Sequence, residues 1–349
     1  MYLRFVRVPC EENKKFETNN GKLISIIFFF VFVFASLGGK TFYTYMADVD
    51  LLTSWLHAMR CGDFATAWNI SDAVLQTKKD QTDLPRCFQR VWDGSSVTGK
   101  RVLLRCYHGL GDTLQFIRYA PLLRAVSAQV IVWAQPSLIP LLRHVHGIDR
   151  LIPLHDGAPD VEYDVDLELN ELPHLLRTTL ASVPADVPYI FVEPASLPRN
   201  GRLHIGLIWQ SGDWDNRRSI PFSVVKRRAQ VPGIEWHILQ REAARAGWDG
   251  AIGSISGGDN PLDDARIMRA LDLIISVDTM TAHLAGALGV HTWTLLPFDA
   301  DWRWMLNRHD SPWYPTMRLF RQREEGNWDE VIDDVAVQLS TLLPQRNVV

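Results

Sequence analysis

The chain has 349 residues, of which 47% are hydrophobic and 22% are charged, and its formal net charge is −4. This charge excludes a dedicated nucleic-acid binder, which would carry a basic excess or a basic stripe. The supply of apolar residues excludes global disorder, and the length predicts two domains rather than one core.

The first 45 residues differ in composition from the rest of the chain. They hold eight of the 15 Phe and none of the 13 Trp, and residues 23–37 carry no charge. That run is short of the roughly 20 apolar residues that span a bilayer, although it fits the apolar region of a signal peptide. Three interpretations stay open: a start-site extension with the natural start at Met46, a membrane anchor, or a cleaved signal.

Residues 46–100 are predicted to form a helical hairpin and a linker. Apolar residues recur at helical spacing on both sides of Gly62 and Asp63, which predicts two helices joined by a turn. The pair resembles a single tetratricopeptide-type unit. Because stacked repeats need about three copies for stability, we expect the pair to pack on the main body. Residues 79–100 are polar and turn-rich, and Trp92 is expected to anchor them.

Strand and helix patterns alternate in 101–190 and again in 200–343, separated by a proline-rich stretch near 184–199. This alternation predicts an α/β fold of two Rossmann-like domains with parallel sheets and helices on both faces. Ligands of such sheets bind at the carboxyl ends of the strands, so the cleft between the domains is the expected site. Strands are predicted at 101–106, 129–134, 151–154, 163–167, 203–210, 234–239, 272–277 and 291–296, and helices at 113–126, 137–143, 221–229, 263–271, 279–288 and 328–343.

The motif at 108–113, His-Gly-Leu-Gly-Asp-Thr, lies between a predicted strand and helix. Gly109 and Gly111 allow a tight turn and a close approach of the backbone to a ligand. Asp112 then stands at a helix N-terminus, where it either faces the cleft or caps the helix. Leu114 occupies the third glycine position of the dinucleotide fingerprint, which argues against a nucleotide oxidoreductase.

The segment 278–289 follows a predicted buried strand. Asp278 ends the strand and Thr279 opens a helix, whose free N–H groups and dipole favour a diphosphate. His283 lies four residues further on, so it can face the same side as Thr279. The alternative is a capped core helix with one satisfied histidine.

Two loops complete the candidate site. Arg217 and Arg218 precede a helix, and a guanidinium suits bidentate contact with phosphate; the alternative is a solvated loop. In 299–315, Trp302, Trp304 and Tyr314 are candidates for a lid over a base or sugar, or for a hydrophobic plug between the domains.

The cysteines and remaining histidines predict no metal site. Cys10, Cys61, Cys87 and Cys106 form no C-x-x-C pair, which argues against a zinc cluster and favours reduced thiols. His144 and His146 lack acidic or cysteine partners at metal spacing and are expected at the surface.

Residues 48–342 resemble glycosyltransferase family 9, the heptosyltransferase-like enzymes of the GT-B fold, and especially the bacterial type in which such a domain follows tetratricopeptide units. The segments 109–123, 276–290 and 295–322 carry the resemblance. It implies a general base at Asp112 and a donor diphosphate site at Asp278, Thr279 and His283. It also implies a basic loop residue at Arg218 or Arg217, and nucleoside contacts at Gln240 and Glu242. Met280 replaces a small residue of the family and is expected to narrow the diphosphate pocket.

The function that the resemblance implies is inverting, metal-independent transfer of a sugar from a nucleoside-diphosphate sugar to a glycan or lipid-linked hydroxyl. No cofactor beyond this co-substrate is expected. The enzyme would be cytoplasmic, at the inner face of the membrane, and anchored there if residues 1–45 are genuine. Two alternatives remain: a sugar-nucleotide epimerase, and a non-catalytic module whose hairpin recruits a protein partner.

Overall fold

The computed structural model describes residues 42–212, 215–258 and 260–342, apart from 77–90, and the side chains from residue 50 onward. Most of the segment 1–45 lies outside these residues, so its three interpretations stay open. Cys10 and Cys87 also lie outside the described residues. None of the described helices combines the length and the apolar character needed to cross a membrane. Cys61 and Cys106 are free thiols, and His144 and His146 are exposed, as predicted.

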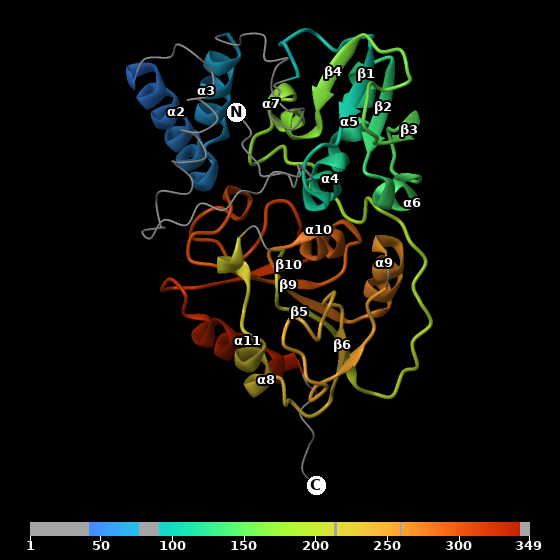
Figure 1. Ribbon diagram of the computed structural model, residues 1–349, viewed down its shortest axis with the longest axis vertical. Helices are drawn as coiled ribbons and strands as arrows, with labels where there is room; N and C mark the ends of the chain where they lie inside the picture. The colour runs from blue at the N-terminus through green and yellow to red at the C-terminus, as the bar shows by residue number, and fades with distance from the viewer. Residues whose placement is uncertain (1–41, 77–90, 213–214, 259, 343–349) are drawn as a thin grey trace.

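The predicted helical hairpin is confirmed. Helix α2 (Phe42–Cys61) and helix α3 (Phe64–Gln76) are joined at Gly62, whose φ of 76° suits a glycine. The hairpin packs on the rest of the protein, as Figure 1 shows. Trp68 of α3 is buried, and its indole N–H donates to the carbonyl of Thr178 at 2.6 Å. Trp92, at the start of the next described segment, is buried as expected.

The first α/β unit contains a four-stranded parallel sheet, sheet A, in the order β3-β2-β1-β4. Its strands are β1 (Arg101–Arg105), β2 (Gln129–Ala134), β3 (Arg150–Pro153) and β4 (Val165–Glu168). Its helical segments are α4 (Leu110–Phe116), η2 (Ile117–Tyr119), α5 (Ala120–Val126), η3 (Pro136–Leu138), α6 (Ile139–Leu142), η4 (Leu169–Glu171) and α7 (Leu172–Leu175).

Two predictions for this unit are wrong in detail. The single helix expected over 113–126 is divided by the 3-10 turn η2, and Pro121 lies in the first turn of α5, where its missing N–H costs nothing. Helices were expected on both faces of sheet A. In the described chain they cover the face that bears Val102 and Leu104, whereas the loop 154–163 packs on Leu103 and Trp133 on the other face.

The second unit contains a six-stranded parallel sheet, sheet B, in the order β10-β9-β8-β5-β6-β7. Its strands are β5 (Leu203–Ile208), β6 (Ile234–Ile238), β7 (Ser254–Ile255), β8 (Leu273–Val277), β9 (Thr292–Leu296) and β10 (Met317–Arg321). Its helical segments are η5 (Asn216–Arg218), α8 (Phe222–Arg228), α9 (Pro261–Ala270), α10 (Met280–Ala287), η6 (Trp302–Trp304) and α11 (Trp328–Leu342). The sequence did not predict β7 or β10.

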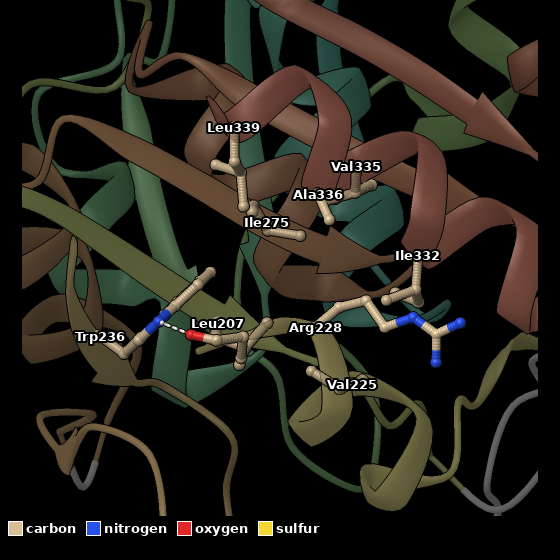
Figure 2. Close-up of a pocket in the computed structure, with 10 residues that line it drawn as sticks. Leu207, Val225, Arg228, Trp236, Ile275, Ile332, Val335, Ala336 and Leu339 are labelled. Atoms are coloured by element: carbon tan, nitrogen blue, oxygen red, sulfur yellow. Dashed lines mark hydrogen bonds between the residues drawn. The ribbon is translucent and has the colours of Figure 1, made fainter. Parts of the chain in front are cut away.

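Helices cover both faces of sheet B. Helices α8 and α11 pack on one face, and α9 and α10 on the other. A shallow apolar pocket lies between sheet B and the α8–α11 pair, lined by residues that include Leu207, Ile275, Ile332 and Leu339 (Figure 2). This pocket lies on the face opposite α10, so it is separate from the predicted site.

An ionic cluster helps to hold the hairpin against the first unit. Asp72 of α3 accepts hydrogen bonds at 2.8 Å from His174 and from both terminal nitrogens of Arg177. The Arg177 guanidinium lowers the pKa of Asp72. Burial lowers the pKa of His174 to about 4, against the opposing effect of Asp72.

We expect His174 to make stability depend on pH. Between pH 6.5 and about 4, this histidine is protonated in the unfolded chain and neutral in the folded one. The unfolded state then binds more protons than the folded state. Through this group, the free energy of unfolding therefore decreases by about 1.4 kcal/mol for each pH unit by which the pH is lowered. Urea unfolding at a series of pH values should show a shallower slope for His174→Gln in this window. The stability that Asp72 contributes is lost only when the pH falls below 3.8, the ordinary pKa of an aspartate.

His144→Gln is the matched control, because His144 is exposed. This variant should keep the slope of the parent protein. An unchanged slope in His174→Gln would contradict the assignment.

Candidate functional site

The first predicted motif forms the turn between β1 and α4. Gly109 precedes the helix, and its N–H donates to Oδ2 of Asp112 at 3.0 Å. Asp112 is the third residue of the helix, where its carboxylate closes a capping box. The interpretation of Asp112 as a capping residue is therefore confirmed, and its side chain is almost fully buried.

Asp112 also forms a buried ion pair that the sequence did not predict. Arg303 of η6 donates through a terminal nitrogen to Oδ1 of Asp112 at 2.7 Å. The other terminal nitrogen of Arg303 contacts Asp301 at 2.9 Å, and its Nε donates to the side chain of Gln115. The guanidinium carbon lies 4.6 Å from the ring centre of Trp302. Arg303 is only 1% exposed, so these partners replace its hydration.

The structure places the aromatic residues of 299–315 in the interior, as a hydrophobic plug would require, and the lid stays a prediction. Trp302, Trp304 and Tyr314 are all buried. The rings of Trp302 and Trp55 of α2 are packed edge to face, with 5.6 Å between their centres. The ring of Trp304 stacks on that of His283 of α10, with 5.3 Å between their centres. Burying large aromatic side chains removes much apolar surface from water, and here they fill the junction between the hairpin, α4 and α10.

The donor-side motif folds as expected at the end of β8. Asp278 follows the strand, and Thr279 is the N-cap of α10, where its hydroxyl accepts the N–H of Thr281 at 3.3 Å. Nδ1 of His283 lies 3.0 Å from the hydroxyl of Tyr314. The other ring nitrogen, Nε2, lies 3.9 Å from Oδ1 of Asp278. Both interpretations of His283 hold in part: it has a partner, and it faces the strand-end carboxylate.

Arg218 joins this group from η5. Its guanidinium donates to the carbonyl of Asp278 at 2.8 Å and lies 3.8 Å from the Asp278 carboxylate. Its side chain is 12% exposed, which gives solvent limited access to it. Arg218, Asp278, Thr279 and His283 therefore lie together around the start of α10, as the sequence predicted.

The N-terminal ends of α4 and α10 meet at the junction of the two units (Figure 1). A Cβ atom at Gly111 would lie 2.9 Å from Cδ2 of His283 and 3.4 Å from Cα of Met280. Gly111 is thus needed for the close approach of these helices, which the sequence did not predict, and its close approach to a ligand stays a prediction. Met280 lies at this contact, and its expected effect on a diphosphate pocket stays a prediction.

Three other predicted residues have partners of their own. Arg217 is half-exposed and pairs with Asp215 at 2.9 Å. The side-chain oxygen of Gln240 accepts the backbone N–H groups of Trp209 and Gln210, so it ties β5 to β6. Glu242 is exposed and pairs with Arg245 at 3.0 Å. The structure therefore does not bring these side chains into the group around Asp278.

Sequence reasoning missed a buried polar group on the first unit. His108, after β1, forms an ion pair with Glu168 at the end of β4, and both are almost fully buried. Asn170, in η4, is 1% exposed, and its amide has no hydrogen-bond partner in the described part of the chain. The available signal was a glutamate at the end of a strand whose alternate residues Val165 and Leu167 are apolar.

A second missed residue is Arg118, which lies in η2 among apolar neighbours. It is 4% exposed, and its guanidinium lies 4.4 Å from the ring centre of Tyr314 and 4.6 Å from that of Tyr189. It also donates to the backbone carbonyl of Trp313. A single arginine inside an apolar helical pattern was the available signal, and here it cross-links the units.

Comparison with known proteins gives distant similarities. No protein-family model matches the chain. It is 26% identical over 285 residues to Protein FlbA of Caulobacter vibrioides, which covers 71% of this chain and 48% of that protein. The chain therefore spans about half the length of that relative.

Three solved structures show distant likeness. A glycosyl transferase family 9 protein from Veillonella parvula has a TM-score of 0.49 at 11% identity, covering 73% of this chain and 93% of that one. The glycosyltransferase TibC from enterotoxigenic E. coli has a TM-score of 0.49 at 14% identity, and the match covers 68% of this chain and 67% of that one. The E. coli ADP-heptose lps heptosyltransferase II has a TM-score of 0.46 at 12% identity, and the match covers 69% of this chain and 99% of that one. Likenesses this distant support no statement about activity.

We expect Gly111→Ala to destabilise the protein. The added methyl group would meet His283 at 2.9 Å, and overpacking of this kind costs about 1–3 kcal/mol. Chemical denaturation should show the loss. Gly212→Ala is the control, because its Cβ would have no neighbour within 4 Å. Equal stability of the two variants would contradict the close approach of α4 and α10.

Proposed function

We propose that the chain is a glycosyltransferase that moves a sugar from a nucleoside-diphosphate sugar to a hydroxyl of a glycan or lipid-linked acceptor, with inversion and without a metal ion in the transfer step. The observation that carries this proposal is the meeting of two helix N-termini, one bearing Asp112 and the other Asp278 and Thr279. The family resemblance of the same motifs supports it.

The donor diphosphate would bind at the start of α10. The free N–H groups there carry partial positive charge, and anions are stabilised at such helix ends. Arg218 adds a guanidinium, which can offer two parallel N–H groups to phosphate oxygens. Its present contact with the Asp278 carbonyl aims it at this helix end. These groups would stabilise the negative charge that develops on the departing diphosphate.

Asp112 would act as the general base on the acceptor hydroxyl. The acceptor oxygen forms a bond to the anomeric carbon of the sugar while the acceptor hydroxyl gives its proton to the Asp112 carboxylate. The bond between the anomeric carbon and the diphosphate oxygen breaks on the opposite face of the sugar. The carboxylate oxygens of Asp112 accept hydrogen bonds from Arg303 and from Gly109, which hold the side chain in one orientation. An ionised carboxylate is an acceptor only, so it can take the proton of a hydroxyl.

The acceptor would approach from the first unit, where His108, Glu168 and Asn170 place polar groups at the carboxyl edge of sheet A. Opening of the junction would admit substrates, and closing it would exclude water and protect the donor from hydrolysis. In this assignment the enzyme needs no cofactor beyond its co-substrate. We place it in the cytoplasm, at the inner face of the membrane where a lipid-linked acceptor would lie.

Two other functions make different predictions. An epimerase would convert a sugar nucleotide in the absence of any acceptor. A non-catalytic module would recruit a partner through the hairpin α2–α3 and would bind no sugar nucleotide. A thermal-shift panel of nucleoside diphosphates and sugar nucleotides, followed by transfer assays on each hit, separates these functions. Absence of stabilisation by every member would favour the module.

Arg218→Ala should weaken binding of the nucleoside diphosphate that the panel selects. A charged hydrogen bond contributes about 1.5–3 kcal/mol, so calorimetry should show a loss of about tenfold or more. Arg217→Ala is the matched control, because the neighbouring Arg217 is half-exposed and turned toward Asp215. Unchanged affinity in Arg218→Ala would remove this residue from the site.

Asp112→Asn should lose turnover and keep donor affinity. The loss of a general base costs about 10²–10⁴-fold in rate, and the donor groups lie on the other helix. Transfer rate and calorimetry on the same protein sample measure both quantities.

Asp301→Asn controls for the ion pair, because Asp301 contacts the same Arg303 guanidinium. Both variants should lose stability, whereas only Asp112→Asn should lose turnover. Transfer at the parent rate in Asp112→Asn would show that another group is the base.

A further inference from the structure

Two histidines and a glutamate meet near the amino edge of sheet B, at the end of the strands opposite Asp278. His204 is the second residue of β5, and Glu235 and His237 are the second and fourth residues of β6. The strand register pairs His204 with Glu235. Because alternate strand residues share a face, all three side chains point to the face that α9 covers.

The three side chains converge on one point. Nδ1 of His204 lies 2.9 Å from Nε2 of His237. Each of the three residues offers one nitrogen or oxygen atom, and these atoms all lie within 4.8 Å of one another. In the described part of the chain, no other group of three or more His, Cys, Asp or Glu side chains has this arrangement.

The surroundings hold these ligand atoms in place. Nδ1 of His237 lies 2.8 Å from the hydroxyl of Ser256, which fixes the ring orientation. Asn200 donates a hydrogen bond to Glu235. The backbone N–H of His204 donates to Asp272 at 2.8 Å, which anchors the start of β5. Such outer contacts are typical of metal-binding histidines and carboxylates.

The contact between the His204 and His237 rings requires either a proton or a cation between the two facing nitrogens. Two imidazole nitrogens 2.9 Å apart repel if both present lone pairs, so without a cation one of them carries the proton of a hydrogen bond. Nε2 of His204 is buried and has no hydrogen-bond partner in the described chain. A proton on Nδ1 can therefore move to Nε2 of the same ring, and both facing lone pairs then become available to a metal ion.

The distances suit a tetrahedral ion after a small adjustment. Zinc–nitrogen bonds of about 2.0–2.1 Å at a tetrahedral angle place two ligand nitrogens about 3.3 Å apart. The rings would separate by roughly 0.4 Å, which is small for side chains at a strand end. His204 and His237 are nearly fully buried, whereas Glu235 is partly exposed. Solvent therefore reaches the site from the glutamate side.

We propose that His204, Glu235 and His237 bind one zinc ion, with water as the fourth ligand. Two imidazoles and a carboxylate match the nitrogen and oxygen donors that zinc prefers. The ion would bridge β5 and β6 and stabilise this edge of the sheet. The site lies at the opposite edge from Asp278, so it takes no part in the proposed transfer step.

The test titrates zinc chloride alone into the full chain after treatment with a chelator, in competition with a chromophoric chelator. We expect one zinc ion per chain and a higher midpoint of thermal unfolding with zinc. His237→Gln and Glu235→Gln should each lower the affinity by at least about 100-fold, because even outer contacts cost about 10–100-fold when removed. Ser256→Ala should lower it by about tenfold on the same basis.

His144→Gln is the control, because His144 is an exposed histidine on the first unit. It should bind zinc as the parent does. Cobalt in place of zinc should give visible d–d absorption bands that Glu235→Gln abolishes. If His237→Gln does not fold, Glu235→Gln decides, because Glu235 is partly exposed. Absence of stoichiometric zinc binding, or parental affinity in Glu235→Gln, would overturn the proposal and leave a hydrogen-bonded histidine pair.

Discussion

The buried guanidinium of Arg303 is the constraint on which the junction of the two units depends. A guanidinium stays charged in proteins, and a buried charge is tolerated only when it is paired and hydrogen-bonded. Asp112 from the first unit and Asp301 from the second supply the carboxylates. Helix α4 is therefore fixed against the segment after β9, and Asp112 is held both by the capping box of its own helix and by a residue of the second unit.

The same junction explains why the helical hairpin is part of the protein body. The ring of Trp55 in α2 packs on that of Trp302, and the ring centre of Phe64 in α3 lies 6.3 Å from that of Trp313. Both hairpin helices therefore contact the aromatic segment after β9. One apolar cluster runs continuously from the hairpin through sheet A to α10, whereas the α8–α11 side of sheet B has a separate cluster. A single pair of helices thus becomes stable by burying its face on two units, in place of the neighbouring repeats that it lacks.

The sequence allowed prediction of what depends on local pattern. The alternation of apolar runs and helical periods located most strands to within two residues, and the strand-end motifs located Asp278, Thr279 and Arg218 at one helix. It could not reveal Arg303 as the partner of Asp112, because 191 positions separate them. The mixed polar and aromatic sequence of 299–315 left a lid and a plug equally open, because burial of its aromatic residues depends on contacts with distant segments. Strand β7 was missed because two residues are too few to show a period.

Under the proposed function, an acceptor hydroxyl must reach Asp112, and the contact of Gly111 with His283 leaves no room for it between α4 and α10. The two units must therefore move apart at this contact. Separating Asp112 from Arg303 would remove one of the two carboxylates that pair with a buried guanidinium, whereas separating α10 from the segment after β9 breaks the ring contact of Trp304 with His283 and the hydrogen bond of His283 with Tyr314. The least costly opening keeps Arg303 with α4 and moves α10 away. The segment after β9 then travels with the first unit, although it belongs to the second in sequence.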